Sequence, residues 1–343
     1  ELFTVLHILD PIRWNSSKEF TARYCRAKKK KGKKLKPGSE YKGASNTHEL
    51  HLILTDTLMI RRLKGDILKD LPKKHREIVQ VAIMDDVERA ELREMYEEIR
   101  RRESEIAERK KSRAQNRRGG PANQNKRFRV ETGTGMMIPI DDNAKEGENG
   151  ATGDKEKRMS MLMMLFSRTG SAKVPSILEH LSTFLSDASN GKVLIFAHHT
   201  NVLKSLAQFC EDGGYGFIKI DGSTHAEDRQ SLVQNFQKSP RIRVAVLAIT
   251  AAGVALTLTA AATVYFAEMF WTPGSLLQAE DRAHRIGQLN QVNIKYFLAS
   301  NTVDELLWPL VREKMKTLGE ICEGRIVEAF KATNATEGGK DWD

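Results

Sequence analysis

The sequence predicts an α/β fold built on an open parallel sheet with flanking helices. In the second half of the chain, short and nearly continuous apolar runs alternate with amphipathic stretches. Runs rich in Val, Ile and Leu are typical of strands buried on both faces of a parallel sheet. Their alternation with helices favours right-handed crossover connections. We expect strands at residues 193–197, 217–220, 242–249, 263–267 and 292–298, and helices at residues 201–211, 225–237, 252–258 and 275–286.

Composition divides the rest of the chain. Residues 1–106 show helical periodicity and are expected to be mainly helical, with one helix over residues 85–102. Residues 107–157 are charged, rich in Asn and Gly, and poor in apolar side chains. Such a segment buries too little apolar surface to offset the entropy of ordering, so it is expected to be a disordered insertion. The folded lobe then spans residues 158–330, and residues 331–343 form a flexible tail.

The charge of the chain indicates a polyanionic partner. The net charge is +10 and the pI is about 9.4, which favours nucleic acid; a basic protein without such a partner is the alternative. The basic run at residues 28–36 suits a nuclear signal, a phosphate contact or a solvated loop. The three cysteines lie far apart, which argues against a structural zinc site and favours reduced intracellular thiols. No apolar run approaches the roughly 20 residues that span a bilayer.

The run Q-A-E-D-R-A-H-R-I-G-Q at residues 278–288 is the most informative motif. In a helix, Gln278, Arg282 and Arg285 lie at i, i+4 and i+7, on one face. Gly287 stands where such a helix would end. Two guanidinium groups side by side on a rigid element suit a polyphosphate, because each binds phosphate oxygens through a planar fork. The alternative interpretation is a solvated polar face.

Polar residues follow three of the expected strands at the edge of the sheet where ligands gather. Near helix starts, hydroxyl groups and free N–H groups suit phosphate, although ordinary helix capping is an equal alternative for each residue. As a set they resemble a track for a DNA backbone, which positions a strand without reading its sequence. Two of these residues, His198 and His199, could bind a metal, but no carboxylate or Cys lies at metal-ligand spacing from them. These candidate DNA contacts are His198, His199, Thr200, Ser223, Thr224 and Thr250.

Several motifs, in order, resemble the Swi/Snf-type ATPases, the DNA translocases of helicase superfamily 2. The run at residues 278–288 resembles motif VI of that family, and residues 59–72 resemble the segment entering its second lobe. Residues 193–200, 220–224 and 248–259 resemble motif IV, the next block and motif V. The phrases F-A-H-H and Y-F-A-E, and Tyr24-Cys25 with the later Gly-Ala-Ser-Asn, are similar to the annealing-helicase (HARP-like) branch.

The resemblance implies a RecA-like C-terminal lobe preceded by a helical protrusion region and connector. It implies that Arg282 and Arg285 are arginine fingers, which reach the phosphates of an ATP held mainly by a first lobe. Gln278, Gly253 and Asp281 would lie on the nucleotide side, although a tight helix start explains Gly253 equally well. The motif V region reads Ala-Ala-Gly-Val where many members have R/K-A-G-G, so its local contacts stay open. Arg61, Arg62 and Lys64 are interpreted as structural or lobe-bridging residues.

The chain contains no P-loop sequence G-x4-G-K-[ST], whose backbone N–H groups would cradle phosphates. We therefore expect the C-terminal half of an ATPase, which needs a first lobe for both ATP and Mg²⁺ and is inactive alone. The resemblance implies a nuclear DNA translocase or annealing helicase that rewinds or remodels forked or duplex DNA in replication and repair. The alternatives are a non-catalytic DNA-binding fragment and an RNA helicase lobe.

Overall fold

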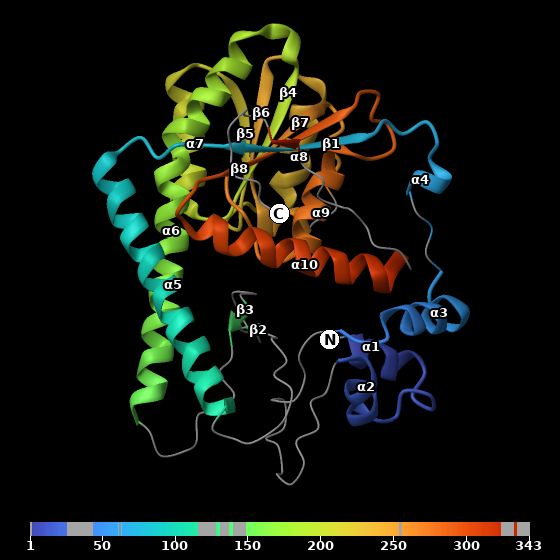
Figure 1. The fold of residues 1–343 in the computed structure, drawn as a ribbon. Coiled ribbons are helices and arrows are strands. Elements are labelled where there is room, and N and C mark those ends of the chain that lie inside the picture. The colour runs from blue at the N-terminus through green and yellow to red at the C-terminus, as the bar shows by residue number, and fades with distance from the viewer. Residues whose placement is uncertain are drawn as a thin grey trace. The chain divides into compact units, whose positions relative to one another are not determined.

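The protein is described here from a computed structural model (Figure 1). The structure describes residues 2–25, 44–60, 62, 64–115, 128–130, 137–139, 149–253, 256–323 and 333–334. The chain divides into two compact units. Unit 1 comprises Glu1–Leu63, Glu108–Asp154 and Glu313–Ala329, and unit 2 comprises Lys64–Ala107, Lys155–Arg312 and Phe330–Asp343.

Unit 2 contains the expected parallel sheet. Within the described residues it has the strand order β5-β6-β4-β7-β8-β1-β9, and every pair is parallel. All five expected strands are present, so the α/β fold class is confirmed. The strands are β1 (Lys74–Gln80), β4 (Lys192–Ala197), β5 (Gly216–Ile220), β6 (Ile242–Ala248), β7 (Ala261–Phe266), β8 (Val292–Leu298) and β9 (Thr333–Asn334).

The centre of the sheet forms the core because apolar residues dominate both faces of its strands. In β4, residues Val193 to Ala197 are completely buried. Helices α7 and α8 pack against β5 and β6, and α9 packs against β7. The helices are α4 (Lys64–Ile67), α5 (Asp86–Gln115), α6 (Asn149–Ser186), α7 (Thr200–Asp212), α8 (Ala226–Lys238), α9 (Pro273–Ala283) and α10 (Val303–Glu323), with 3-10 turns η1 (Ala188–Asn190) and η2 (Ile249–Gly253).

The secondary structure differs from the prediction in two places. The described part of residues 1–106 is mainly helical, as expected, but strand β1 within it lies in the sheet and pairs along its whole length with β8. Charged side chains at Lys74, Arg76 and Glu77 conceal the strand pattern in the sequence. The helix expected at residues 252–258 is also absent from its described part: η2 ends at Gly253, and residues 256–258 are irregular. Buried Leu256 and Leu258 account for the apolar periodicity there.

The insertion expected at residues 107–157 overlaps with two helices. Helix α5 runs to Gln115, and α6 begins at Asn149, so both helices enter the range 107–157. A short antiparallel pair, β2 (Phe128–Val130) and β3 (Met137–Pro139), lies between them. The rest of that range, most of the 331–343 tail and the basic run at 28–36 lie outside the described residues.

The N-terminal part of unit 1 is helical, as expected. Helices α1 (Leu2–Leu9), α2 (Ser17–Tyr24) and α3 (Thr47–Thr57) surround a small apolar core. Arg23 pairs with Glu49 across α2 and α3 at 2.7 Å. The core residues are Leu6, Trp14, Phe20, Tyr24, Leu50 and Leu54. Within the described part of the chain, no helix has the length and apolar character needed to cross a membrane.

Candidate functional site

The two candidate arginines lie at the end of α9. The helix ends at Ala283, so Arg282 is in its last turn and Arg285 is beyond it. The expectation that both arginines share one face of a helix reaching residue 286 is therefore wrong for Arg285. The chain turns through residues 284–287, and Gly287 has a φ of +97°, which favours glycine. We call residues 282–288 the arginine turn.

Both arginines of this turn reach the segment that follows η2. Arg282 donates from Nη1 to the Leu256 carbonyl at 3.3 Å, and Arg285 donates from Nη1 to Thr257 Oγ1 at 3.3 Å. The structure thus brings together the motif V-like and motif VI-like segments. Burial lowers the pKa of Arg282, and the charge of Arg285 lowers it further. Arg282 Nε is buried and has no hydrogen-bond partner among the residues that the structure describes.

This arrangement fits an anion. A buried donor without a partner is costly, and two guanidinium groups that repel each other gain when a phosphate lies between them. The residues present therefore suit the polyphosphate that the sequence predicts. Two further residues are predicted on the nucleotide side from α9 and η2. Gln278 is exposed on α9, and Gly253 ends η2. Their contacts with nucleotide stay predictions.

Asp281 uses both carboxylate oxygens within the protein. Oδ1 lies 2.7 Å from Lys74 Nζ, and Oδ2 lies 2.7 Å from Lys64 Nζ. Burial by itself would raise the pKa of Asp281, but the two ammonium groups outweigh burial and lower it. These ion pairs fix Asp281 to α4 and to the first residue of β1. A direct contact of Asp281 with nucleotide stays a prediction.

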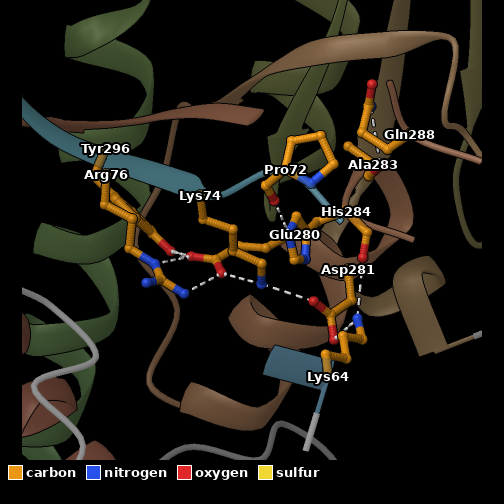
Figure 2. A network of polar contacts seen from close by, with 10 residues as sticks. All are labelled: Lys64, Pro72, Lys74, Arg76, Glu280, Asp281, Ala283, His284, Gln288 and Tyr296. Carbon is orange, nitrogen blue, oxygen red and sulfur yellow. Dashed lines mark hydrogen bonds and ion pairs between the residues drawn. The ribbon is translucent and has the colours of Figure 1, made fainter. Parts of the chain in front are cut away.

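Asp281 is one member of a larger polar network, drawn in Figure 2. Its neighbour Glu280 is fully buried and accepts hydrogen bonds from Lys74 Nζ at 2.9 Å, Arg76 Nη2 at 2.6 Å and the Tyr296 hydroxyl at 2.8 Å. Burial opposes ionisation of Glu280, yet the two cations keep its pKa below the ordinary value. Lys64, Lys74 and Arg76 thus hold Glu280 and Asp281. We call these five residues the α9 clamp.

Gln288 holds the far end of the arginine turn, a role that the sequence does not reveal. Its side chain is buried, and Nε2 lies within hydrogen-bond distance of the carbonyls of Thr259 (3.1 Å), Ala261 (2.8 Å) and Ala283 (3.2 Å). Its Oε1 accepts from the Asn290 N–H at 3.0 Å. The last residue of the H-R-I-G-Q run therefore joins the turn to the start of β7.

The candidate DNA contacts all lie at the carboxyl ends of neighbouring strands, where the sequence predicts them. His198, His199 and Thr200 follow β4, Ser223 and Thr224 follow β5, and Thr250 follows β6. Among the described residues of this edge, Thr200, Ser223 and Thr250 are exposed, whereas Thr224 and the two histidines are half-buried.

Asp221 shapes the turn that carries Ser223 and Thr224. Its Oδ1 accepts from the Ser223 N–H at 2.9 Å and from the Ser223 hydroxyl at 2.5 Å. The Asp221 N–H donates to Thr224 Oγ1 at 3.0 Å. The hydrogen bond from the Ser223 hydroxyl is the main cause that lowers the pKa of Asp221 to about 2. Asp221 therefore orients the Ser223 hydroxyl through its carboxylate and the Thr224 hydroxyl through its backbone N–H before any ligand binds.

Glu268 organises the chain after β4 and is a second residue that sequence reasoning missed. Its buried carboxylate accepts from the His198 and His199 N–H groups at 2.6 and 2.8 Å. His199 Nδ1 lies 2.5 Å from Glu268 Oε1. Burial favours the neutral acid, but these contacts lower the pKa of Glu268. The phrase Y-F-A-E is the only sequence signal for this carboxylate.

The two histidine rings lie in an aromatic cluster. The centre of the His198 ring is 5.1 Å from that of the Phe270 ring and 5.4 Å from that of the Trp271 ring. The centre of the His199 ring is 4.6 Å from that of the Phe166 ring. Burial lowers the pKa of His198. In the parts of the chain that the structure describes, no three His, Cys, Asp or Glu side chains are grouped to hold a metal ion.

Comparisons with known proteins show which proteins the chain resembles. The family described as "Helicase conserved C-terminal domain" matches residues 173–287. The chain is 35% identical, over 97% of its length, to the SWI/SNF-related matrix-associated actin-dependent regulator of chromatin subfamily A-like protein 1 of Xenopus tropicalis, covering 30% of that protein. It is 34% identical, over 100% of its length, to the human DNA annealing helicase and endonuclease ZRANB3, covering 27% of that protein.

A solved structure shows the same fold. The crystal structure of the C-terminal part of the Fun30 ATPase domain aligns with a TM-score of 0.50 and 17% identity, covering 70% of this chain and 90% of that one. The sheet is RecA-like, and residues 173–287 match a helicase conserved C-terminal domain. Homologues that align with nearly the whole chain are a SWI/SNF-related protein and a DNA annealing helicase. The chain spans about a third of the length of these curated relatives.

Proposed function

We propose that this chain is the C-terminal lobe of an ATP-dependent DNA translocase of the annealing type, in which Arg282 and Arg285 act on the phosphates of ATP. The carrying observation is their convergence beside residues 256–257, with Arg282 Nε buried and without a hydrogen-bond partner in the described part of the chain. A first lobe holds ATP and Mg²⁺ in this proposal. The two guanidinium groups then stabilise the charge that develops on the transferring phosphoryl group.

The carboxyl edge of β4, β5 and β6 is the proposed DNA track. The exposed residues Thr200, Ser223 and Thr250 there carry hydroxyl groups that suit backbone phosphates, and such contacts fix position without reading sequence. The names of the relatives support DNA annealing as the activity and chromatin as the setting. Forked DNA as the substrate, replication and repair as the process, and a nuclear location belong to the same proposal.

The test is DNA-stimulated ATPase activity of the chain, alone and combined with the first lobe of an annealing-helicase relative. We expect turnover only in the combination. Arg282→Ala should reduce that turnover by roughly 10³–10⁵, the range measured for arginine fingers. Lys204→Ala, which removes an exposed lysine on α7, is the matched control and should keep wild-type turnover.

Other outcomes identify the alternatives. Full turnover by Arg282→Ala would refute the arginine-finger role. Salt-sensitive DNA binding without turnover in any combination would indicate a non-catalytic DNA-binding fragment. Stimulation by single-stranded RNA in place of forked DNA would indicate an RNA helicase lobe. A binding assay in which forked DNA and single-stranded RNA compete for the chain separates the DNA-binding fragment from the RNA helicase lobe.

A further inference from the structure

We propose that Lys64 is a positioning residue for the arginine turn. Its effect on turnover rests on the proposed function above, whereas its effect on the turn itself does not. Lys64 lies in α4, far from α9 in the sequence, and Figure 2 shows its ammonium group beside the end of α9. The ammonium group contacts one residue before Arg282 and one residue after it.

The two contacts bracket the catalytic candidate. Lys64 Nζ lies 2.7 Å from Asp281 Oδ2, immediately before Arg282, and donates to the His284 carbonyl at 3.0 Å, immediately before Arg285. The His284 carbonyl lies at the C-terminal end of the helix, where unpaired carbonyl groups carry partial negative charge. One cation therefore holds the backbone on both sides of Arg282 and directly before Arg285.

Other contacts anchor the helix itself, so the contribution of Lys64 is local. Buried Glu280 ties α9 to Lys74 and Arg76 of β1. From the opposite direction, His284 Nε2 lies 2.7 Å from the Pro72 carbonyl. The Lys64 side chain is 41% exposed, unlike those of Lys74 (14%) and Arg76 (18%). Loss of Lys64 should therefore loosen residues 284–290 and leave the sheet intact.

Hydrogen exchange of the chain tests the positioning role without any ligand. The variants are Lys64→Ala, the conservative Lys64→Arg and the control Lys204→Ala. We expect Lys64→Ala to speed exchange of the Arg285, Gln288 and Asn290 amides about three- to tenfold, the range for loss of one partly exposed charged hydrogen bond. Exchange in β4 should stay unchanged, and Lys64→Arg should restore most of the protection.

Unchanged exchange at residues 284–290 in Lys64→Ala would overturn the proposal. Equal acceleration throughout unit 2 would also overturn it, because it would show general destabilisation in place of local positioning. The control variant must match the wild type at every amide, since Lys204 lies on α7 and has no part in the clamp.

The ATPase combination supplies the second readout. Lys64→Ala should lower kcat about ten- to a hundredfold, because a small misplacement of a catalytic group has effects of that order. The KM for ATP should stay within about twofold, the pattern for an interaction realised in the transition state. If Arg282→Ala abolishes turnover and Lys64→Ala leaves kcat at the wild-type value, the positioning role fails while the proposed function stands. If Arg282→Ala keeps full turnover, the proposed function fails, and hydrogen exchange alone decides the role of Lys64.

Discussion

At the scale of single residues, the buried carboxylate of Glu268 depends on a glycine. A Cβ atom at Gly170 in α6 would lie 2.2 Å from Glu268 Oε1, closer than nonbonded atoms approach. The missing side chain thus gives the carboxylate room to reach the His198 and His199 N–H groups. Glycine is needed here for space, since its backbone is helical.

We predict that Gly170→Ala lowers the free energy of unfolding by about 1–3 kcal/mol, the usual cost of overpacking a filled site. It should also weaken DNA binding, because the chain after β4 must move with Glu268. The matched control is Gly274→Ala in α9, where a new Cβ meets nothing within 4 Å. Helix propensity should leave that variant as stable as the wild type or up to about 1 kcal/mol more stable. Urea unfolding measures the stability of both variants, and equal stability of the two would contradict the prediction.

At the scale of elements, a buried ion pair joins α6 to α10 and β8. Lys173 Nζ lies 2.8 Å from Asp304 Oδ2 and donates to the Phe297 carbonyl at 2.8 Å, and both side chains are almost fully buried. Asp304 Oδ2 also accepts from the Ala299 N–H at 3.0 Å. Such a pair specifies which elements meet, because either charge left alone inside the protein is strongly unfavourable.

We expect Lys173→Met to lower the free energy of unfolding by about 3–5 kcal/mol, since it leaves a buried carboxylate unpaired. Adding Asp304→Asn should recover much of that loss. The comparison is Lys295→Met, which removes the half-exposed Lys295–Glu77 pair at 3.7 Å and should cost less than about 1 kcal/mol. Chemical denaturation of the three variants checks the order; similar losses for Lys173→Met and Lys295→Met would refute it.

The elements also show what the sequence can predict. The five strands with continuous apolar runs are found because burial on both faces leaves a clear pattern. Strand β1 is missed because Lys74 and Arg76 look solvent-facing, although they pair with Glu280 from α9. Such long-range pairing leaves no local signal. For the same reason, the sequence correctly predicts that Arg282 lies in a helix but wrongly extends that helix to Arg285. Gln288 stabilises the turn after the helix through carbonyl groups of distant residues, which no local pattern reveals.

At the scale of the whole molecule, the net charge of +10 governs any encounter with a polyanion. We predict that the Kd for forked duplex DNA rises at least tenfold, roughly, between 50 and 200 mM salt, because bound cations are released from several phosphates. Fluorescence anisotropy at a series of salt concentrations measures the slope. A change below about twofold would show that phosphate contacts contribute little. The charge predicts this class of partner, but it does not predict which face binds.

The pairing of β1 with β8 has a consequence for how the chain acquires its fold. Lys74 aligns with Val292, and β4 to β7 are encoded between them. During synthesis, β1 therefore emerges before β4 to β8 and stays without its partner β8 until most of the sheet has been made. Such distant pairing slows folding and leaves strand edges open to association with other chains. The same delay separates Lys74 and Arg76 from Glu280, so the α9 clamp can form only after α9 has been synthesised.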